Sequence, residues 1–181
     1  MGFFFLADGF EEIEGLTVVD ILRRAGIDIS MISINGKKKV TGAHGIALDT
    51  DEDIVQCDPD KLDMLVLPGG MPGTTNLAAC EKLTEALKKA DQEKRGIAAI
   101  CAAPSVLGDL GFLKGKKAVC YPGFESRLTG VEVLAVPVVT DGHITPSRGM
   151  GTAIAFALEL TKRLKDEETA KQVSRSILYN V

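Results

Sequence analysis

Short apolar runs alternate with helical patterns along this chain, and that alternation restricts the available folds more than any other feature. Short apolar runs bounded by glycine, proline or charged residues are typical of buried strands, whereas apolar residues at three- and four-residue steps are typical of helices. Strand and helix in turn, with short connections, predict a mostly parallel sheet with helices on both faces. The fold class that we expect is therefore α/β.

The pattern predicts strands at residues 3–7, 27–34, 63–67, 96–100, 118–121 and 144–147, with a small hairpin over 40–48. It predicts helices over 11–25, from Thr75 or Asn76 to about 90, from Pro104 to about 110, and over 152–164 and 167–178. Residues 131–139 and 144–147 flank a turn at Asp141 and Gly142. No repeat or linker divides the sequence, so we expect a single domain over residues 1–181.

Composition excludes several classes of partner. The net charge is −4 and Lys37 to Lys39 form only a short basic run, so nucleic acid is not expected. No apolar stretch approaches the ~18 to 20 residues of a membrane span, and the run at 3–7 is too short for a signal peptide. The cysteines form no CxxC pair and the histidines have no metal-ligand spacing. We expect a cytoplasmic protein with free thiols, no metal and no cofactor.

Cys101 directly follows the apolar strand 96–100 and precedes the helix expected at Pro104. The small residues Ala102 and Ala103 allow a sharp, strained turn that lifts the sulfur to the sheet edge where α/β proteins bind ligands. A helix N-terminus there would lower the thiol pKa and favour the nucleophilic thiolate. The alternative is that Cys101 is a small buried hydrophobe, as most free cysteines are.

Three carboxylates, Glu11, Glu12 and Glu14, stand where the first strand gives way to a helix. Glu11 and Glu14 share one helix face, so we expect only one of them to point inward. A carboxyl beside the sulfur would have its pKa raised and could shuttle protons. Acidic residues in the first turn of a helix also arise for dipole reasons alone.

The turn Pro68-Gly69-Gly70 ends another predicted strand. Backbone N–H groups of Gly69 and Gly70 could form half of an oxyanion hole, with the N–H of Ala102 as the other half. The alternative is a plain tight turn. A GxG at 149–151 lacks the further glycine and the acid of a dinucleotide site. His143 is expected at the surface.

Five segments, in this order and spacing, resemble the ThiJ/PfpI superfamily, and more narrowly its branch of bacterial ThiJ-like proteins and the Parkinson-disease-linked redox protein. Each segment alone is modest evidence, but together they are specific and extend over nearly the whole chain. The segments are 6–14 (LADGFEEIE), 23–26 (RRAG), 66–70 (VLPGG), 98–104 (AAICAAP) and 145–152 (TPSRGMGT).

The resemblance implies a flavodoxin-like three-layer sandwich that forms a homodimer. It implies that Cys101 is the elbow cysteine and that Glu14 is the acid hydrogen-bonded to its sulfur. It implies Gly70 and Ala102 as backbone N–H donors. By position, the residues that would contact the site region from the dimer side are Arg24 and His44.

Two positions depart from related branches of the superfamily. Ala102 stands where the protease and amidotransferase-like branches have a histidine, and Tyr121 stands where some members have one. No Cys–His dyad is therefore visible in the sequence, and peptide hydrolysis loses its base. Glu14 remains as the acid/base candidate, with the hydroxyl of Tyr121 as a possible helper.

Three hypotheses of function follow. The first is a glutathione-independent glyoxalase or deglycase-like activity, in which Cys101 attacks a small reactive aldehyde such as methylglyoxal. The second is a non-enzymatic peroxide sensor or chaperone-like dimer that uses the same cysteine. The third is an amidase or protease, which the missing histidine disfavours. The same residues serve the first two hypotheses, so the sequence does not choose between them.

Overall fold

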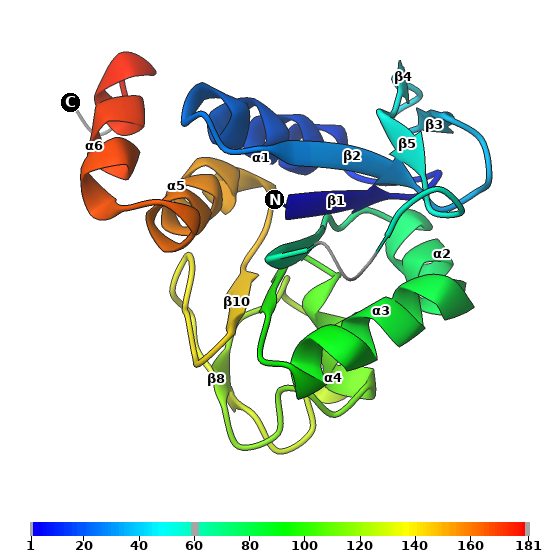
Figure 1. Cartoon of the computed structure of the whole chain (residues 1–181). Helices are drawn as coiled ribbons and strands as arrows, with labels where there is room; N and C mark the ends of the chain where they lie inside the picture. Colours follow the sequence, from blue (N-terminus) through cyan, green and yellow to red (C-terminus); the bar gives the residue numbers. More distant parts are fainter. Residues whose placement is uncertain (1, 59–61, 180–181) are drawn as a thin grey trace.

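The computed structural model describes residues 2–58 and 62–179 (Figure 1). A six-stranded sheet lies at the centre, in the order β10-β7-β6-β1-β2-β5, and its pairings are parallel. Without the short edge strand β5, this is the 2-1-3-4-5 order of flavodoxin-like folds, which confirms the expected fold class. The strands are β1 (Gly2–Leu6), β2 (Ile29–Ser33), β5 (Glu52–Asp53), β6 (Met64–Leu67), β7 (Gly96–Ile100) and β10 (Ile144–Ser147).

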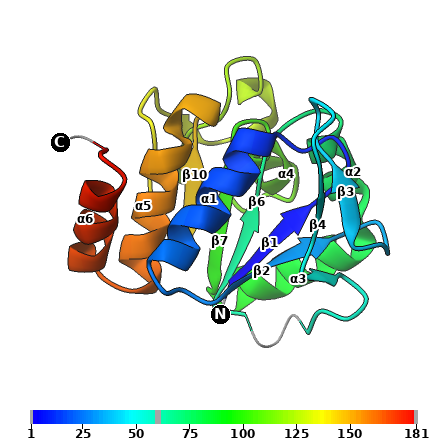
Figure 2. The same cartoon turned by 90° about the horizontal axis from the view of Figure 1, so that it is seen from above.

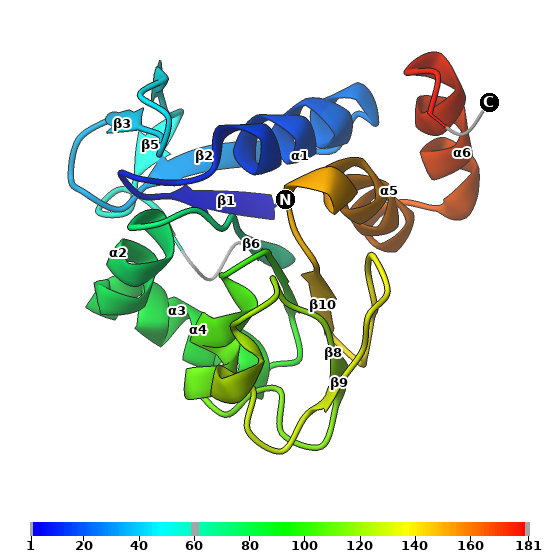
Figure 3. The ribbon, with the colours of Figure 1, turned by 180° about the vertical axis from the view of Figure 1, so that it is seen from behind.

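Helices cover both faces of this sheet, as the alternating pattern predicts (Figures 1 and 3). On one face lie α1 (Glu12–Arg24) and α5 (Ala153–Leu164), with α6 (Glu167–Ser176) packed on the outer side of α5 (Figure 2). On the other face lie α2 (Gly73–Ala79), α3 (Glu81–Gln92) and α4 (Pro104–Asp109). Among residues 2–58 and 62–179, no helix is long and apolar enough to cross a membrane.

Strand β1 shows why the sheet is buried on both sides. Phe3 and Phe5 join the apolar cluster under α3, while Phe4 and Leu6 join the cluster under α1 and α5. Successive side chains of a strand point to opposite faces, so a continuous apolar run is stable only where helices cover both faces. The two apolar clusters therefore sandwich the sheet and fix the positions of its strand ends.

Two small sheets lie outside the central one. The predicted hairpin is confirmed as β3 (Lys39–Thr41) paired antiparallel with β4 (Ala47–Asp49). Its tip is held to the start of α1, because Ala43 N–H donates to the carbonyl of Phe10 at 2.8 Å. The second small sheet pairs β8 (Lys117–Ala118) with β9 (Glu132–Val133) in parallel.

Several sequence predictions are wrong in detail. The helix expected from Thr75 or Asn76 begins at Gly73, and extended backbone at Cys80 divides it into α2 and α3. Asn76 is not a cap, because its side chain donates to the carbonyl of Asp8 at 2.8 Å. Cys80 therefore lies between two helices and not within one.

The run 131–139, expected to flank the turn at Asp141 and Gly142, forms only β9 and a single bridge at Val138, and Pro137 within that run has no N–H for a ladder. His143 is buried and not at the surface, because its Nε2 lies 2.7 Å from a carboxylate oxygen of Asp91. The imidazole thus ties the start of β10 to α3.

Candidate active site

The carboxyl ends of β1, β6 and β7 meet at one edge of the sheet, and the segments that follow them build the site. Cys101 comes directly after β7 and has a φ of +66°, a left-handed conformation that side chains rarely adopt. Its N–H donates to the carbonyl of Ser147 at 3.0 Å, and its carbonyl accepts from Tyr121 at 2.7 Å. These two bonds hold a turn that costs of order 1–3 kcal/mol in strain. The predicted strained turn is confirmed.

Glu14 lies in the first turn of α1 and is fully buried. Its Oε2 accepts a hydrogen bond from the Gly69 N–H at 2.8 Å, and the carboxyl is hydrogen-bonded to the sulfur of Cys101. Its Oε1 is buried and has no hydrogen-bond partner among the described residues. Glu11 instead caps the helix by accepting from the Glu14 N–H at 2.7 Å. The expectation that only one of this pair points inward is confirmed.

The carboxyl and the thiol perturb each other. Burial raises the pKa of Glu14 to about 7, although hydrogen bonds from Cys101 and Gly69 oppose the rise. Burial also raises the pKa of the Cys101 thiol to about 12, and the charge and hydrogen bond of Glu14 contribute to that rise. The expected lowering of the thiol pKa by a helix N-terminus is therefore wrong. Helix α4 has only six residues and begins three residues after the cysteine.

Near neutral pH, this arrangement leaves Cys101 as a thiol beside a carboxyl that is about half ionised. An ionised Glu14 is positioned to take the thiol proton when the sulfur attacks, which is general-base catalysis. The backbone N–H groups of Gly70 and Ala102 both hydrogen-bond the sulfur and partly offset its burial. They are thus directed at the point where a reacting atom would arrive.

Gly69 has a different role from the one expected. Its N–H donates to Glu14 and so is not free for an oxyanion. A Cβ at this position would lie 2.6 Å from the Cβ of Cys101 and 2.8 Å from Oε2 of Glu14. Glycine is required here because the carboxyl and the cysteine both pack against the bare backbone. Gly69 therefore positions Glu14, and of the three expected donors only Gly70 and Ala102 contact the sulfur.

A hollow of about 490 Å³ opens above the sulfur. Tyr121 lines it, and so does His44 of the same chain, which the resemblance places on the dimer side. Arg24, the other residue placed on the dimer side, does not line it. Arg24 lies in the last turn of α1, ten residues and about 15 Å along the helix from Glu14, where it pairs with Asp20. The other lining residues are Glu11, Pro122, Arg148, Gly149, Met150, Gly151 and Thr152, together with Glu14, Gly70 and Cys101.

Glu12, the middle carboxylate of the cluster, is buried under the β3–β4 hairpin. Its Oε2 lies 2.8 Å from Nδ1 of His44, and its Oε1 accepts from the N–H groups of His44 at 2.7 Å and Ile46 at 3.4 Å. Glu11, Glu12 and His44 are also a set whose ligand atoms lie within 4.8 Å of one another, as a metal site requires. Protein donors already engage both oxygens of Glu12, which favours an ion pair over a metal.

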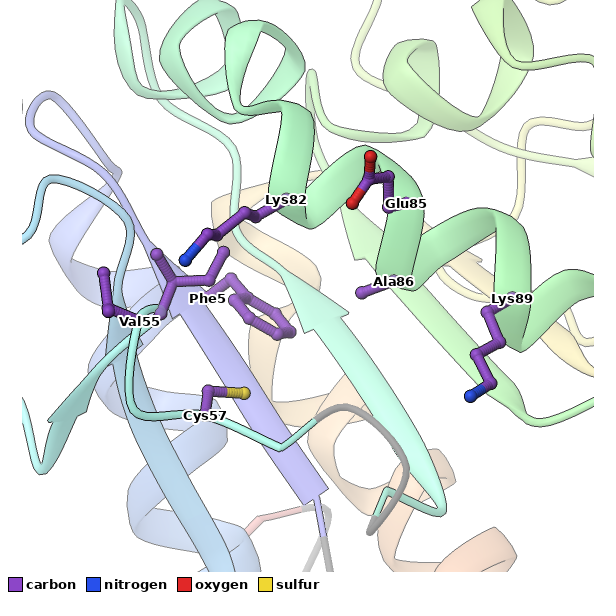
Figure 4. A pocket seen from close by; sticks show the side chains of 8 residues that line it. Phe5, Val55, Cys57, Lys82, Glu85, Ala86 and Lys89 are labelled. Carbon is purple, nitrogen blue, oxygen red and sulfur yellow. The ribbon is translucent and has the colours of Figure 1, made fainter.

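A second hollow, of about 410 Å³, is lined by another cysteine, Cys57. Figure 4 shows Cys57 and Phe5 on one side of this hollow, and Lys82, Glu85 and Lys89 of α3 on the other. Burial raises the pKa of Cys57 to about 12, and the nearby acids Glu52 and Asp58 add to the rise. Among the described residues here, Cys57 has neither the left-handed backbone of Cys101 nor a carboxyl hydrogen-bonded to its sulfur. The edge at Cys101 is therefore the candidate active site.

A parallel α/β sandwich with a strained cysteine turn and a buried acid at its carboxyl edge defines a class of proteins built around one thiol. Residues 3–163 match the model of the DJ-1/PfpI family, and the chain belongs to that family. The resemblance seen in the sequence is thereby confirmed.

Known relatives agree with this assignment. Protein DJ-1 homolog A of Arabidopsis thaliana is 39% identical over 176 residues, 96% of this chain but 45% of the relative. The chain thus spans less than half the length of the Arabidopsis relatives that it matches. A deglycase of Pyrococcus abyssi is 33% identical over 161 residues, 88% of this chain and 96% of the relative. The crystal structure of Drosophila melanogaster DJ-1beta has a TM-score of 0.95 at 34% identity, covering 99% of this chain and 98% of its own.

Sequence reasoning missed the hairpin partner of Glu12 and the place of Arg148 in the lining of the hollow. Glu12 was seen as part of an acidic cluster, but nothing indicated its own partner on the hairpin. Gly42 carried the only signal, because a Cβ there would lie 2.3 Å from Cδ of Glu12. Arg148 was seen only within a rejected dinucleotide motif and within the segment 145–152, with no role of its own. His44, the partner of Glu12, and Arg148 both lie on loops, whose path a periodic pattern does not predict.

Glu14→Gln tests the coupling of the carboxyl to the thiol. Wild-type protein should show Cys101 alkylation that increases with pH through about 7, because the Glu14 carboxylate assists the thiol. The variant should not show this increase near pH 7, since general-base assistance is absent. Its alkylation at pH 7.5 should be slower by roughly ten-fold or more. Iodoacetamide labelling followed by peptide mass spectrometry measures the rates. Identical pH profiles for the two proteins would contradict the coupling.

Gly69→Ala tests the close approach at the turn after β6. The added methyl group must displace Cys101 or Glu14, so we expect a loss of about 1–3 kcal/mol in unfolding free energy. Gly151→Ala is the control, because no atom lies within 4 Å of its added Cβ. Urea denaturation of both variants measures the difference. Equal stability of the two would show that the turn has more room than the structure gives it.

Proposed function

We propose that the chain is a Cys101-dependent enzyme of the glyoxalase or deglycase type that converts small reactive aldehydes such as methylglyoxal. The observation that carries this proposal is the buried Glu14 carboxyl hydrogen-bonded to the Cys101 sulfur, with a pKa raised to about 7. A carboxyl with that pKa both accepts and releases protons at neutral pH. The similarity to a deglycase of Pyrococcus abyssi supports the same substrate class.

The reaction begins with the sulfur. Glu14 takes the thiol proton as Cys101 attacks the aldehyde carbon of methylglyoxal, and a C–S bond forms. Negative charge develops on the aldehyde oxygen, which the N–H groups of Gly70 and Ala102 stabilise. Glu14 then returns its proton to that oxygen, which leaves a hemithioacetal on Cys101.

The second stage is an isomerisation on the enzyme. Glu14 removes the proton from the former aldehyde carbon and delivers it to the neighbouring ketone carbon through an enediolate. The hemithioacetal thereby becomes a thioester of lactate. Water cleaves the thioester, which releases lactate and restores the thiol.

Cys101→Ser tests this function. The variant should convert methylglyoxal to lactate at least about 100-fold more slowly, because a hydroxyl lacks the nucleophilicity of a thiol in this site. Cys57→Ser is the control and should keep the wild-type rate, since Cys57 lies in the other hollow. Coupled detection of lactate gives the rates. A Cys101→Ser protein with the parent rate would end the proposal.

A peroxide sensor is the second candidate, favoured by the partial exposure of Cys101 and its hydrogen bond to Glu14. A protonated Glu14 donates to a sulfinate oxygen and stabilises the oxidised cysteine. Mild peroxide followed by mass spectrometry separates the two: oxygen added to other thiols but not to Cys101 rejects the sensor. An amidase or protease is the least favoured function, because Ala102 supplies no adjacent base.

We propose further that the protein is a cytoplasmic homodimer. Free thiols at all four cysteines suit a reducing compartment. Ile13 and Leu16 on α1 and Ile46 on the hairpin are 51%, 43% and 55% exposed, an apolar group that a partner would cover. Arg24 lies near the far end of the same helix, away from Glu14. Any contact between Arg24 and an active site would therefore be with the active site of the partner chain.

Ile13→Glu combined with Leu16→Glu tests the dimer. A buried interface that includes these side chains should be lost, because each new carboxylate would be desolvated without a partner. Val55→Glu is the control: Val55 is 66% exposed but lies by the second hollow. Light scattering after gel filtration measures the mass. A double variant with the wild-type mass, whether monomer or dimer, would contradict this interface.

A further inference from the structure

The isomerisation proposed above moves two protons, and Glu14 accounts for only one of them. A hydrogen moves from the former aldehyde carbon to the ketone carbon. A second proton must leave the hydroxyl on the first carbon and reach the oxygen on the second. Enzymes that shift a proton between adjacent carbons divide this work between a carboxylate for the carbons and a histidine for the oxygens. The second group should therefore stand at the rim of the same hollow.

We propose that His44 transfers the oxygen-bound proton and that Glu12 is its positioning residue. This inference rests on the proposed function and assigns a further catalytic residue to it. His44 lines the hollow that contains Cys101 and Glu14. Its side chain is 71% exposed, so a substrate in the hollow can reach the ring.

The contacts of Glu12 fix the ring in one tautomer. An ionised carboxylate only accepts hydrogen bonds, so Nδ1 of His44, 2.8 Å from Oε2, must carry a proton. No described residue hydrogen-bonds the other nitrogen, Nε2, which leaves its lone pair for a ligand in the hollow. This is the arrangement by which a buried acid orients a catalytic histidine and stabilises its cation.

The hairpin holds this couple in place. Gly9 N–H donates to the carbonyl of Thr41 at 2.7 Å, and Ala43 N–H donates to Phe10 at 2.8 Å, so both sides of the tip are tied to the start of α1. Gly42 has no space for a side chain because Glu12 lies against its backbone. The backbone at His44 is thus set by the same carboxylate that binds its ring.

The charges around the ring support this role. Burial alone would raise the pKa of Glu12, but hydrogen bonds from the ring and backbone of His44 lower it overall. The hydrogen bond to Glu12 and then its charge raise the pKa of His44, with a smaller contribution from Glu11. The other titratable groups that face the hollow are Glu14, Cys101, Tyr121 and Arg148.

The proposed transfer balances. Nε2 of His44 accepts the hydroxyl proton on the first carbon while Glu14 takes the carbon-bound hydrogen, and the ring becomes an imidazolium that Glu12 stabilises. Nε2 then donates its proton to the oxygen on the second carbon. Glu14 protonates that carbon, and both groups return to their starting states with the thioester formed.

His44→Ala is the first test. We expect kcat for methylglyoxal to fall about 100-fold with little change in KM, because binding and attack by Cys101 remain. The Cys101 adduct of one substrate molecule should accumulate in mass spectra, and added imidazole should restore turnover through the exposed gap. Lys39→Gln, on the same hairpin but outside the hollow, should behave as wild type. Wild-type kcat in His44→Ala, or no rescue by imidazole, would overturn the assignment.

Further measurements separate the alternatives. Glu12→Gln should shift the His44 limb of the kcat–pH profile to lower pH, because the carboxylate that raises the pKa is gone; an unmoved limb contradicts the role. If Tyr121→Phe abolishes turnover and His44→Ala does not, the tyrosine transfers the proton. The inference about His44 then fails, while the proposed function stands. If wild-type turnover does not depend on Cys101, both the function and the inference fail. Nitrogen-15 NMR of His44 must show protonated Nδ1 in the neutral ring; the opposite tautomer rejects the proposal without any assay.

Discussion

The hydrogen bond between the buried Glu14 carboxyl and the Cys101 sulfur is the interaction on which the site depends. Raising a carboxyl pKa from 4.5 to about 7 disfavours its ionised form by about 3 kcal/mol. The unfolded chain releases this proton near its ordinary pKa and the folded chain does so later, so stability is lost as pH increases from about 4.5 to 7. The fold therefore maintains a carboxyl that destabilises it at neutral pH, which is typical of functional sites.

The backbone around the site makes the contact between Glu14 and Cys101 possible. Gly69 has no side chain, so Glu14 can reach the cysteine across the end of β6. The left-handed turn at Cys101 is held by neighbours on β10 and after β8, so strands far apart in the sequence share the strain. Because both faces of the sheet are buried, the strand ends cannot shift independently, and the geometry at the edge is rigid.

Sequence reasoning predicted the parts of the structure that have a period. The strand at 96–100 and the turn after it follow from an apolar run ended by small residues, and both agree with the structure. Sequence reasoning failed where a property of a residue depends on contacts with segments distant in the sequence. The thiol pKa is governed by burial and by Glu14, and not by the short helix α4.

In the acidic cluster of Glu11, Glu12 and Glu14, one residue type has three different roles within four positions. Glu11 caps the helix, Glu12 accepts three N–H donors of the hairpin, and Glu14 accepts one backbone N–H beside a thiol. Glu12 and Glu14 are both buried, yet the pKa of Glu12 is lowered and that of Glu14 is raised. The difference follows from the number and charge of their donors, because hydrogen bonds to the ionised form offset desolvation. One carboxylate is thus kept ionised to orient a histidine, while its neighbour stays able to carry a proton.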